Sequence, residues 1–248
     1  MTWSYSRITA YEDCPYKWFL TYIKRLSKQK LFFAGYGSFM HKIIQGYLCG
    51  ELKKSELIGY YLTNFREEVP GNAPNRKVYS NYLKQGTDYL TNITFPYTEV
   101  AEVEKKVEFE LSGIPFVGFI DIVANDNGVI LADNKSRILK PRSKGKKITQ
   151  ADRLLDNYLR QLYLYSIPIS DSHGCPVRLD FNCFRANQFI HEPYIQSELN
   201  ATKAWALERI AEITQTDIWK PNLEYFRCSY LCDVSHHCEY FALFRGSG

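Results

Sequence analysis

Two short apolar segments on either side of the turn "NDNG" restrict the fold of this chain more than any other feature of its sequence. The first contains "GFIDIVA" and the second "VILADNKS", and one acid interrupts each run, Asp121 in the first and Asp133 in the second. Apolar runs of this length between turn residues predict buried β-strands. If "DNG" is a three-residue hairpin loop with Gly128 in the left-handed conformation, residue 125 faces residue 129 and the two acids face each other. The sequence therefore predicts two carboxylates side by side on one face of a sheet.

Two facing carboxylates repel each other unless a positive charge lies between them. Mg²⁺ and Mn²⁺ meet this requirement, because they are hard cations that bind carboxylate oxygens and leave other coordination positions to water and phosphate. Lys135 leaves the same face of the extended chain as Asp133, where its ammonium group can neutralise a phosphoryl oxygen or orient a water molecule. An ordinary ion pair between Asp133 and Lys135 at a strand end explains the spacing equally well. Both interpretations follow from the residues alone.

The rest of the chain places this hairpin in a mixed α/β fold. Residues 1–98 have helical periodicity, interrupted at "VPGNAPN", and "KKVEFELSGIPFVGFIDIVANDNGVILADNKS" predicts a three-stranded meander. A helix that ends at Pro168, two strands and another helix then lead into a Cys-rich tail. We expect one domain over residues 1–248, a small mixed sheet between helices. Its parts are an N-terminal helical region at 1–98, a core at 99–196, and a C-terminal helix and tail at 197–248.

Composition and charge exclude few classes of partner, but the absence of a long apolar run indicates where in the cell the protein is expected. The net charge of +4 permits a polyanionic partner, and an aromatic content of 15% suits both core packing and stacking on nucleobases. The basic loop "SRILKPRSKGKKITQ" is either a solvated surface or a flexible arm that contacts phosphate groups. No apolar run approaches the length of a membrane span, so we expect a soluble cytoplasmic protein without a membrane partner.

The hairpin motif resembles the core of the PD-(D/E)XK nucleases, in particular their RecB-like branch. The match consists of "GFID", eleven residues, and "DNKS". That branch also has a histidine on an upstream helix, for which "GSFMHKII" supplies His41, and we expect Ser38 to be the N-cap of this helix. The resemblance implies a restriction-endonuclease-like fold and Lys135 as the catalytic lysine. It also implies a metal site formed by His41, Asp121, Asp133 and the backbone carbonyl of Asn134.

The helix after the lysine strand extends the resemblance. Gln161 and Tyr165 in "QLYLY" match the Gln-x-x-x-Tyr motif of the RecB-like branch. They lie one helical turn apart and share a face, so we expect them to contact a DNA strand by hydrogen bonding and stacking. One of the glutamates on the strand before the hairpin is able to reach a second metal ion, although we expect a solvated face for Glu102, Glu104, Glu108 and Glu110.

Four of the seven cysteines lie at opposite ends of the chain. Cys14 is near the start, and "CSYLCDVSHHC" places Cys228, Cys232 and Cys238 near the end. Four converging thiolates suit an iron-sulfur cluster or a tetrahedral zinc ion, and either one requires the two ends of the chain to meet. We expect the remaining cysteines to be small buried apolar residues: Cys49, Cys175 and Cys183.

The surroundings of these cysteines also carry a resemblance. "SYSR" and "YEDCPYKW" with a closing Cys triplet are similar to the RecB-like nucleases that hold a 4Fe-4S cluster, including the AddB nuclease domain and the CRISPR adaptation nuclease. The resemblance implies such a cluster. Three residues separate Cys228 from Cys232, where that family usually has two, so zinc bound by the cysteines or by His236 or His237 is an alternative.

Together, these resemblances imply a metal-dependent deoxyribonuclease that hydrolyses phosphodiester bonds, with single-stranded DNA cut from an end or at a flap. They imply a role in DNA repair, recombination or CRISPR adaptation, alongside the proteins of those processes. No Walker A pattern is present, so no helicase motor is expected. The competing hypothesis is a non-catalytic module of the same fold that recognises DNA ends or an adaptation complex. A third is a structural protein whose termini are joined by zinc.

Overall fold

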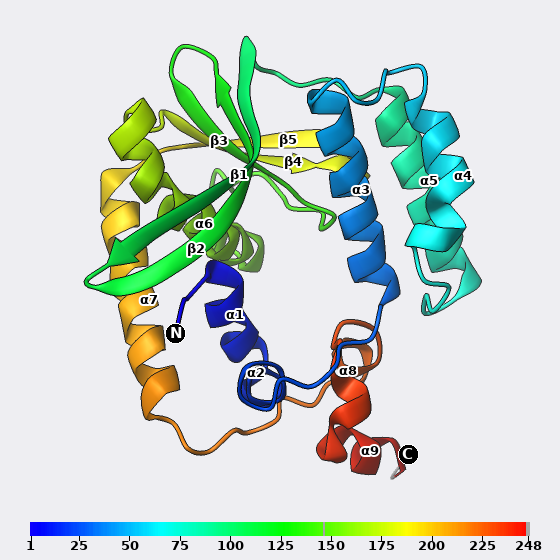
Figure 1. Cartoon of the computed structure of the whole chain (residues 1–248), viewed down its shortest axis with the longest axis vertical. Coiled ribbons are helices and arrows are strands. Elements are labelled where there is room, and N and C mark those ends of the chain that lie inside the picture. The colour runs from blue at the N-terminus through cyan, green and yellow to red at the C-terminus, as the bar shows by residue number, and fades with distance from the viewer. Residues whose placement is uncertain (146, 247–248) are drawn as a thin grey trace.

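The structure is a computed structural model of the whole chain, and it describes residues 1–145 and 147–246. A five-stranded sheet in the order β1-β2-β3-β4-β5 lies at its centre, with helices on both faces (Figure 1). In chain order the helices and strands are α1 (Tyr5–Asp13), α2 (Pro15–Trp18), a π-helical turn (Phe19–Ile23), α3 (Phe32–Leu48), α4 (Leu57–Glu68), α5 (Arg76–Thr91), β1 (Glu99–Leu111), β2 (Ile114–Asn125), β3 (Val129–Asn134), α6 (Gln150–His173), β4 (Arg178–Cys183), β5 (Gln188–Pro193), α7 (Gln196–Gln215), α8 (Tyr225–Tyr230) and α9 (Glu239–Gly246).

The predicted mixed α/β fold is confirmed. β1, β2 and β3 form the antiparallel meander, β3 pairs with β4 in parallel, and β4 pairs with β5 antiparallel. A parallel pair needs a long crossover connection, and α6 supplies it between β3 and β4. Because α6 returns across the sheet, it lies over the strands that carry the predicted acids. None of the described helices is both long enough and apolar enough to cross a bilayer.

The hairpin between β2 and β3 has the predicted register. Asn125 pairs with Val129 across the loop 126–128. Continuing this pairing along the two strands sets Asp121 opposite Asp133, on the face covered by α6. Gly128 has a positive φ of 140°, a conformation that favours glycine, and Asn127 before it is also left-handed, with φ of 56°. Asparagine tolerates the left-handed conformation because its short polar side chain hydrogen-bonds locally.

Two helix boundaries differ from the sequence-based expectation. α3 begins at Phe32 rather than after Ser38, because Phe32 and Tyr36 are buried and extend its apolar face toward the N-terminus by about two turns. α6 does not end at Pro168 but continues to His173. Ile169, directly after the proline, is fully buried, and this packing outweighs the backbone hydrogen bond that the proline removes.

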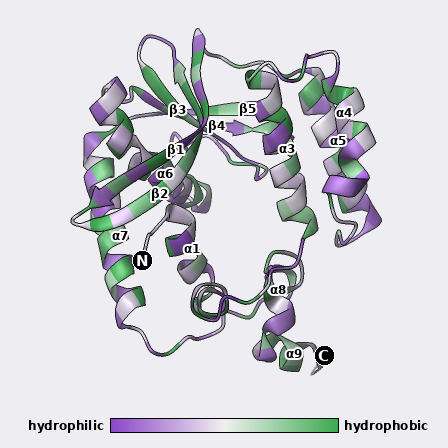
Figure 2. Ribbon diagram, in the orientation of Figure 1, coloured by the Kyte–Doolittle hydropathy of each residue, from purple (hydrophilic) through white to green (hydrophobic). Residues whose placement is uncertain are grey.

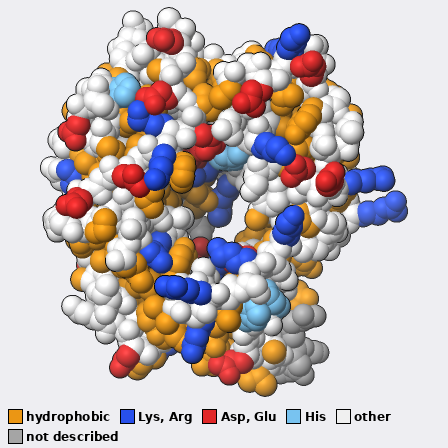
Figure 3. Space-filling model, in the orientation of Figure 1, with side chains coloured by type: hydrophobic (Ala, Val, Ile, Leu, Met, Phe, Trp, Pro, Cys, Tyr) orange, Lys and Arg blue, Asp and Glu red, His pale blue; other side chains and the backbone are white. Residues whose placement is uncertain are grey.

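The two larger hydrophobic clusters lie on one face of the sheet and among the N-terminal helices, and a small third cluster on the other face consists of Ile122, Ala124, Ile130 and Ala132. The first joins α1, α6 and α7 to one face and includes Ile8, Leu131 and Leu164. The second joins α3, α4 and α5 around residues such as Met40 and Tyr61. Figure 2 shows hydrophobic and hydrophilic residues alternating along the outer helices, as expected of helices with one buried face. The arrangement leaves α3 and α1 on opposite sides of a hollow, which opens in the middle of the space-filling view and is lined by Lys and Arg side chains (Figure 3).

Candidate active site

β2 and β3 carry the two predicted acids into one pocket of about 600 Å³. Asp121 is 7% exposed and Asp133 is 3% exposed, so both carboxylates have lost most of their contact with water. Desolvated carboxylates are unfavourable unless hydrogen bonds or cations compensate them. Partners come from three directions: His41 from α3, Lys135 from the end of β3 and Gln161 from α6.

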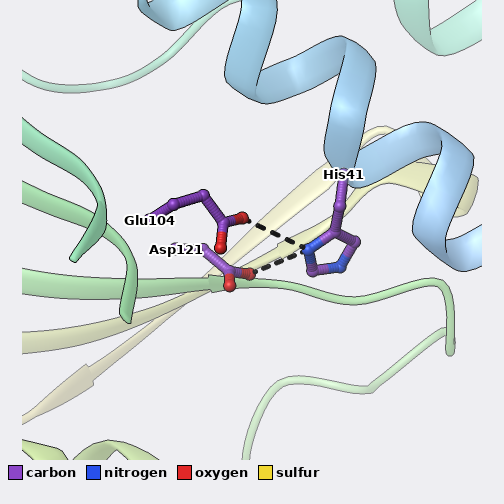
Figure 4. A group of neighbouring side chains, drawn as sticks. All are labelled: His41, Glu104 and Asp121. Carbon is purple, nitrogen blue, oxygen red and sulfur yellow. Dashed lines mark ion pairs between the residues drawn. The ribbon is translucent and has the colours of Figure 1, made fainter. Parts of the chain in front are cut away.

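His41, Glu104 and Asp121 form a compact group (Figure 4). His41 Nδ1 lies 3.4 Å from Asp121 Oδ2 and 3.9 Å from Glu104 Oε1, and the potential ligand atoms of all three lie within 4.8 Å of one another. Glu104 was expected on a solvated face, yet the structure turns it toward His41. It has a φ of 50°, and such left-handed backbone strain, of order 1–3 kcal/mol, occurs preferentially at functional sites.

The electrostatics of this group favour a cation. Burial and the neighbouring Asp133 raise the pKa of Asp121 to about 7. Burial alone acts to lower the pKa of His41, but the hydrogen bond with Glu104 and the charges of Asp121 and Asp133 outweigh burial, so the pKa of His41 is raised. Three carboxylates around one imidazole leave negative charge in excess. A set of carboxylate oxygens with one imidazole nitrogen fits a divalent cation, the imidazole favouring Mn²⁺ over Mg²⁺.

Asp133, Lys135 and Gln161 form a closed triangle beside this group. Lys135 Nζ lies 2.6 Å from Asp133 Oδ2 and donates to Gln161 Oε1 at 3.0 Å, while Gln161 Nε2 donates to Asp133 Oδ1 at 2.8 Å. Burial acts to lower the pKa of Lys135, but Asp133 outweighs it and the pKa is raised, which keeps the ammonium group charged. Its Nζ also lies 4.9 Å from the centre of the Tyr158 ring. The lysine is therefore held in one place by three partners.

Asn134 links the two acids through its backbone. Its N–H donates to Asp121 Oδ2 at 2.6 Å, and its side-chain oxygen accepts from Asn182 Nδ2 at 2.8 Å.

Tyr165 lines the same pocket but is only 4% exposed. Its ring lies against Gly118, where a Cβ atom would come within 2.3 Å. The contact of Gln161 and Tyr165 with DNA stays a prediction.

The basic loop after β3 is partly anchored. Arg142 pairs with Glu192 at 2.9 Å and with Asp156 at 2.7 Å. Ser143 and Thr149 both donate hydrogen bonds to Asp152 near the start of α6. Arg137, Lys140, Lys144 and Lys147 have no ion pair among the described residues, and Lys146 lies outside them.

The two ends of the chain meet at the cysteines. Tyr16 donates a hydrogen bond to Glu239 Oε1 at 2.8 Å, and Gln29 N–H donates to the Asp233 carbonyl at 2.8 Å. α2 accordingly lies near α8 and α9 in Figure 1. One small pocket is lined by all four cysteines of the predicted cluster site: Cys14, Cys228, Cys232 and Cys238.

Cys14 already receives two hydrogen bonds. The backbone N–H groups of Lys17 and Asn222 donate to its sulfur at 3.4 and 3.3 Å. All seven cysteines are free of disulfides. Of the three outside the group, Cys183 is buried as expected, whereas Cys49 and Cys175 are exposed, so the prediction is wrong for those two. Both lie just beyond the end of a helix, Cys49 after α3 and Cys175 after α6.

Comparison with known proteins agrees with this geometry. The sequence model described as "PD-(D/E)XK nuclease superfamily" matches residues 2–239. The crystal structure of a protein from Eubacterium rectale, described as "Putative exonuclease", is 14% identical and covers 95% of this chain and 87% of that one, with a TM-score of 0.58, which is a likeness of fold. The structure of SSO0001 is 18% identical and covers 82% of this chain and 95% of that one. Its TM-score of 0.32 is too low to show a common fold. No curated protein matches the sequence.

Proposed function

The chain belongs to the PD-(D/E)XK nuclease superfamily, and we propose that it is a divalent-metal-dependent deoxyribonuclease that cuts single-stranded DNA from an end or at a flap. One observation carries the proposal: His41 and Asp121, grouped with Glu104, line the same pocket as the paired Asp133 and Lys135. Burying several charged groups at one strand end is unfavourable for stability, and such groups cluster at functional sites.

The cation is proposed to be Mg²⁺ or Mn²⁺. Its ligands are His41, Asp121, Asp133 and the backbone carbonyl of Asn134, and the position of Glu104 adds it to this set. When bound, the cation supplies Lewis acidity, which lowers the pKa of water at the site and offsets the charge of the phosphodiester. The donor chemistry of these residues is the support for this assignment.

The protein's own residues supply the remaining parts of hydrolysis. The ammonium group of Lys135, held by Asp133 and Gln161, faces the pocket, where it stabilises charge that develops on the phosphoryl oxygens or orients the attacking water. The low exposure of Asp133 strengthens its attraction to this charge, because little water screens it. Gln161 touches both residues and acts through them, as a positioning residue.

The four terminal cysteines are proposed to hold a 4Fe-4S cluster rather than zinc. All four cysteines line one small pocket, so a single metal group is able to bind them together. The sequence around them, which is similar to that of the RecB-like nucleases with a 4Fe-4S cluster, favours the cluster. The N–H donors to Cys14 support a thiolate at that position, since hydrogen bonds to the sulfurs of a cluster stabilise their negative charge.

A cleavage assay on end-labelled single strands, with Mg²⁺, Mn²⁺ or EDTA, tests the proposed activity. Wild type is expected to cut only with metal, and Asp133→Ala to lose cleavage while it still binds the strand. Asp217→Ala, at an exposed acid outside the pocket, is the control and keeps full activity. Tight binding without any metal-dependent cleavage would instead identify the alternative, a non-catalytic module that recognises DNA ends or an adaptation complex.

A further inference from the structure

A second pocket, of about 650 Å³, adjoins the candidate active site. It lies between α3, α5 and α8, and its wall includes Ser136 and Arg137, which also line the active-site pocket. The two pockets therefore share part of one wall, and the second pocket is also lined by Cys14. In Figure 3 the middle of the molecule is hollow, with Lys and Arg side chains around the opening.

Aromatic rings form one side of this second pocket. Phe226 of α8, 44% exposed, lies against Phe33 of α3 with their ring centres 5.8 Å apart. Phe33 in turn packs against Tyr82 of α5, at 5.3 Å. The guanidinium of Arg185 lies 3.7 Å from the centre of the Tyr82 ring and donates to the Ser136 carbonyl at 3.2 Å. This series of side-chain contacts thus runs from α8 to Ser136, the residue that follows Lys135.

The charge of the second pocket is positive. Its cationic residues are Lys17, Arg137, Arg185 and Arg227, against only Asp13 and Glu224 as acids. The Glu224 carboxylate is already engaged, because it accepts hydrogen bonds from the backbone N–H groups of Phe226 and Arg227. Arg137 is exposed and has no ion pair in the described part of the chain, which leaves its guanidinium available to an anion.

We propose that this second pocket holds one unpaired nucleotide of the substrate strand, next to the phosphodiester that is cut. Its base stacks on Phe226 and Phe33, and its phosphate lies between Arg137 and Arg185. Base pairing in a duplex would keep the base out of this pocket, so the pocket selects single strands. This inference rests on the proposed nuclease function. It names the residues that contact the nucleotide next to the cleaved bond.

Binding of oligonucleotides with one abasic site, moved along the strand one position at a time, tests the stacking contact. Fluorescence anisotropy in EDTA measures affinity without cleavage. At the position that occupies the pocket, removal of the base is expected to weaken binding to wild type about tenfold. Phe226→Ala is expected to bind the intact strand about as weakly as wild type binds the abasic strand. An abasic site at that position should then cause no further loss of affinity in this variant. Tyr225→Ala is the matched control: this neighbouring aromatic is exposed, does not line either pocket, and should leave the abasic profile unchanged.

Salt dependence tests the phosphate contact. Arg137→Ala is expected to lower the slope of log Kd against log salt by about one, whereas Lys140→Ala, on the same loop but outside both pockets, lowers it less. An abasic profile that is identical in wild type and Phe226→Ala overturns the proposal. Binding is measured in EDTA, so it is independent of cleavage. If the enzyme cuts DNA but the effect of the abasic site does not depend on Phe226, the nucleotide pocket is refuted and the nuclease function is not. If the effect of the abasic site depends on Phe226 but no metal-dependent cleavage occurs, the nuclease function is refuted and the nucleotide pocket is not.

Discussion

Gln161 Nε2 donates a hydrogen bond to Asp133 Oδ1 over 2.8 Å, so the helix that crosses between β3 and β4 holds an acid at the end of β3. The same amide accepts from Lys135 Nζ. The crossover helix of the fold thus sets the relative orientation of the two charged groups assigned to catalysis.

Gln161→Ala is expected to lower kcat about 10- to 100-fold with little change in KM, the usual cost of losing a residue that orients a metal ligand. Steady-state kinetics on a labelled single strand measure both constants. Asn157→Ala, one turn earlier on an exposed part of α6, is the control. A loss in affinity with unchanged kcat would contradict the positioning role and point to direct contact with DNA.

Glu104→Gln keeps the shape of the side chain but removes one negative charge from the group around His41. The Mn²⁺ concentration for half-maximal activity is expected to rise about tenfold, and calorimetric titration should show weaker Mn²⁺ binding. Glu108→Gln lies on the same strand, where Glu108 pairs with Lys106 at the surface, and should behave as wild type. Equal Mn²⁺ affinity in both variants would exclude Glu104 from the site.

Gly118→Ala is expected to destabilise the fold by about 1–3 kcal/mol, because the new methyl group would overlap the buried ring of Tyr165. Denaturant unfolding measures the change. Gly59→Ala on α4, where nothing lies within 4 Å of the added Cβ, is expected to be neutral or stabilising. Adding Tyr165→Leu to Gly118→Ala should recover part of the loss, and no recovery would contradict the steric explanation.

The stability contributed by Asp152 should depend on pH. Its carboxylate accepts two hydrogen bonds from Ser143 and two from Thr149, all of 2.7 to 2.8 Å, which lowers its pKa. The unfolded chain then takes up this proton at a higher pH, near 4. The stabilisation is complete above that value and declines as the pH falls toward the lower pKa of the folded state.

Thermal unfolding of wild type and Asp152→Asn, measured from pH 7 to pH 3, tests this dependence. The difference in Tm should be largest at neutral pH and shrink below about pH 4. Asp156→Asn, at an acid on the same helix that pairs with Arg142, provides the comparison. A difference that stays constant across this range would contradict the role of the Asp152 charge.

Anaerobically purified protein is expected to be brown, with iron and sulfide in equal amounts. Cys228→Ser should lose the colour and also bind single strands more weakly, because Cys228 and Phe226 lie on the same short helix. Cys49→Ser, at an exposed position that does not line the pocket of the four cysteines, should keep both properties. A colourless protein that contains zinc would identify the structural alternative.

Much of the site was predictable because its determinants are local. A three-residue loop sets the register of β2 and β3, so the opposition of Asp121 and Asp133 follows from the hairpin alone. The spacing of Asp133 and Lys135 on one face follows from the pleat. Glu104 was not predicted, since alternating glutamates on a strand are typical of a solvated face and no sequence signal marks the left-handed backbone at that residue.

The sequence by itself determined the mixed α/β class, the hairpin and the identity of the charged residues, because strand alternation, turn chemistry and helix periodicity act over a few neighbours. Only the tertiary structure decided which distant groups meet: His41 with Glu104, Gln161 with Asp133, and Cys14 with the cysteines at the other end of the chain. It also continued α6 past Pro168 and buried Tyr165. The physical reason is that burial between elements far apart in the chain outweighs local preference, and that burial is set by how whole helices pack on the sheet.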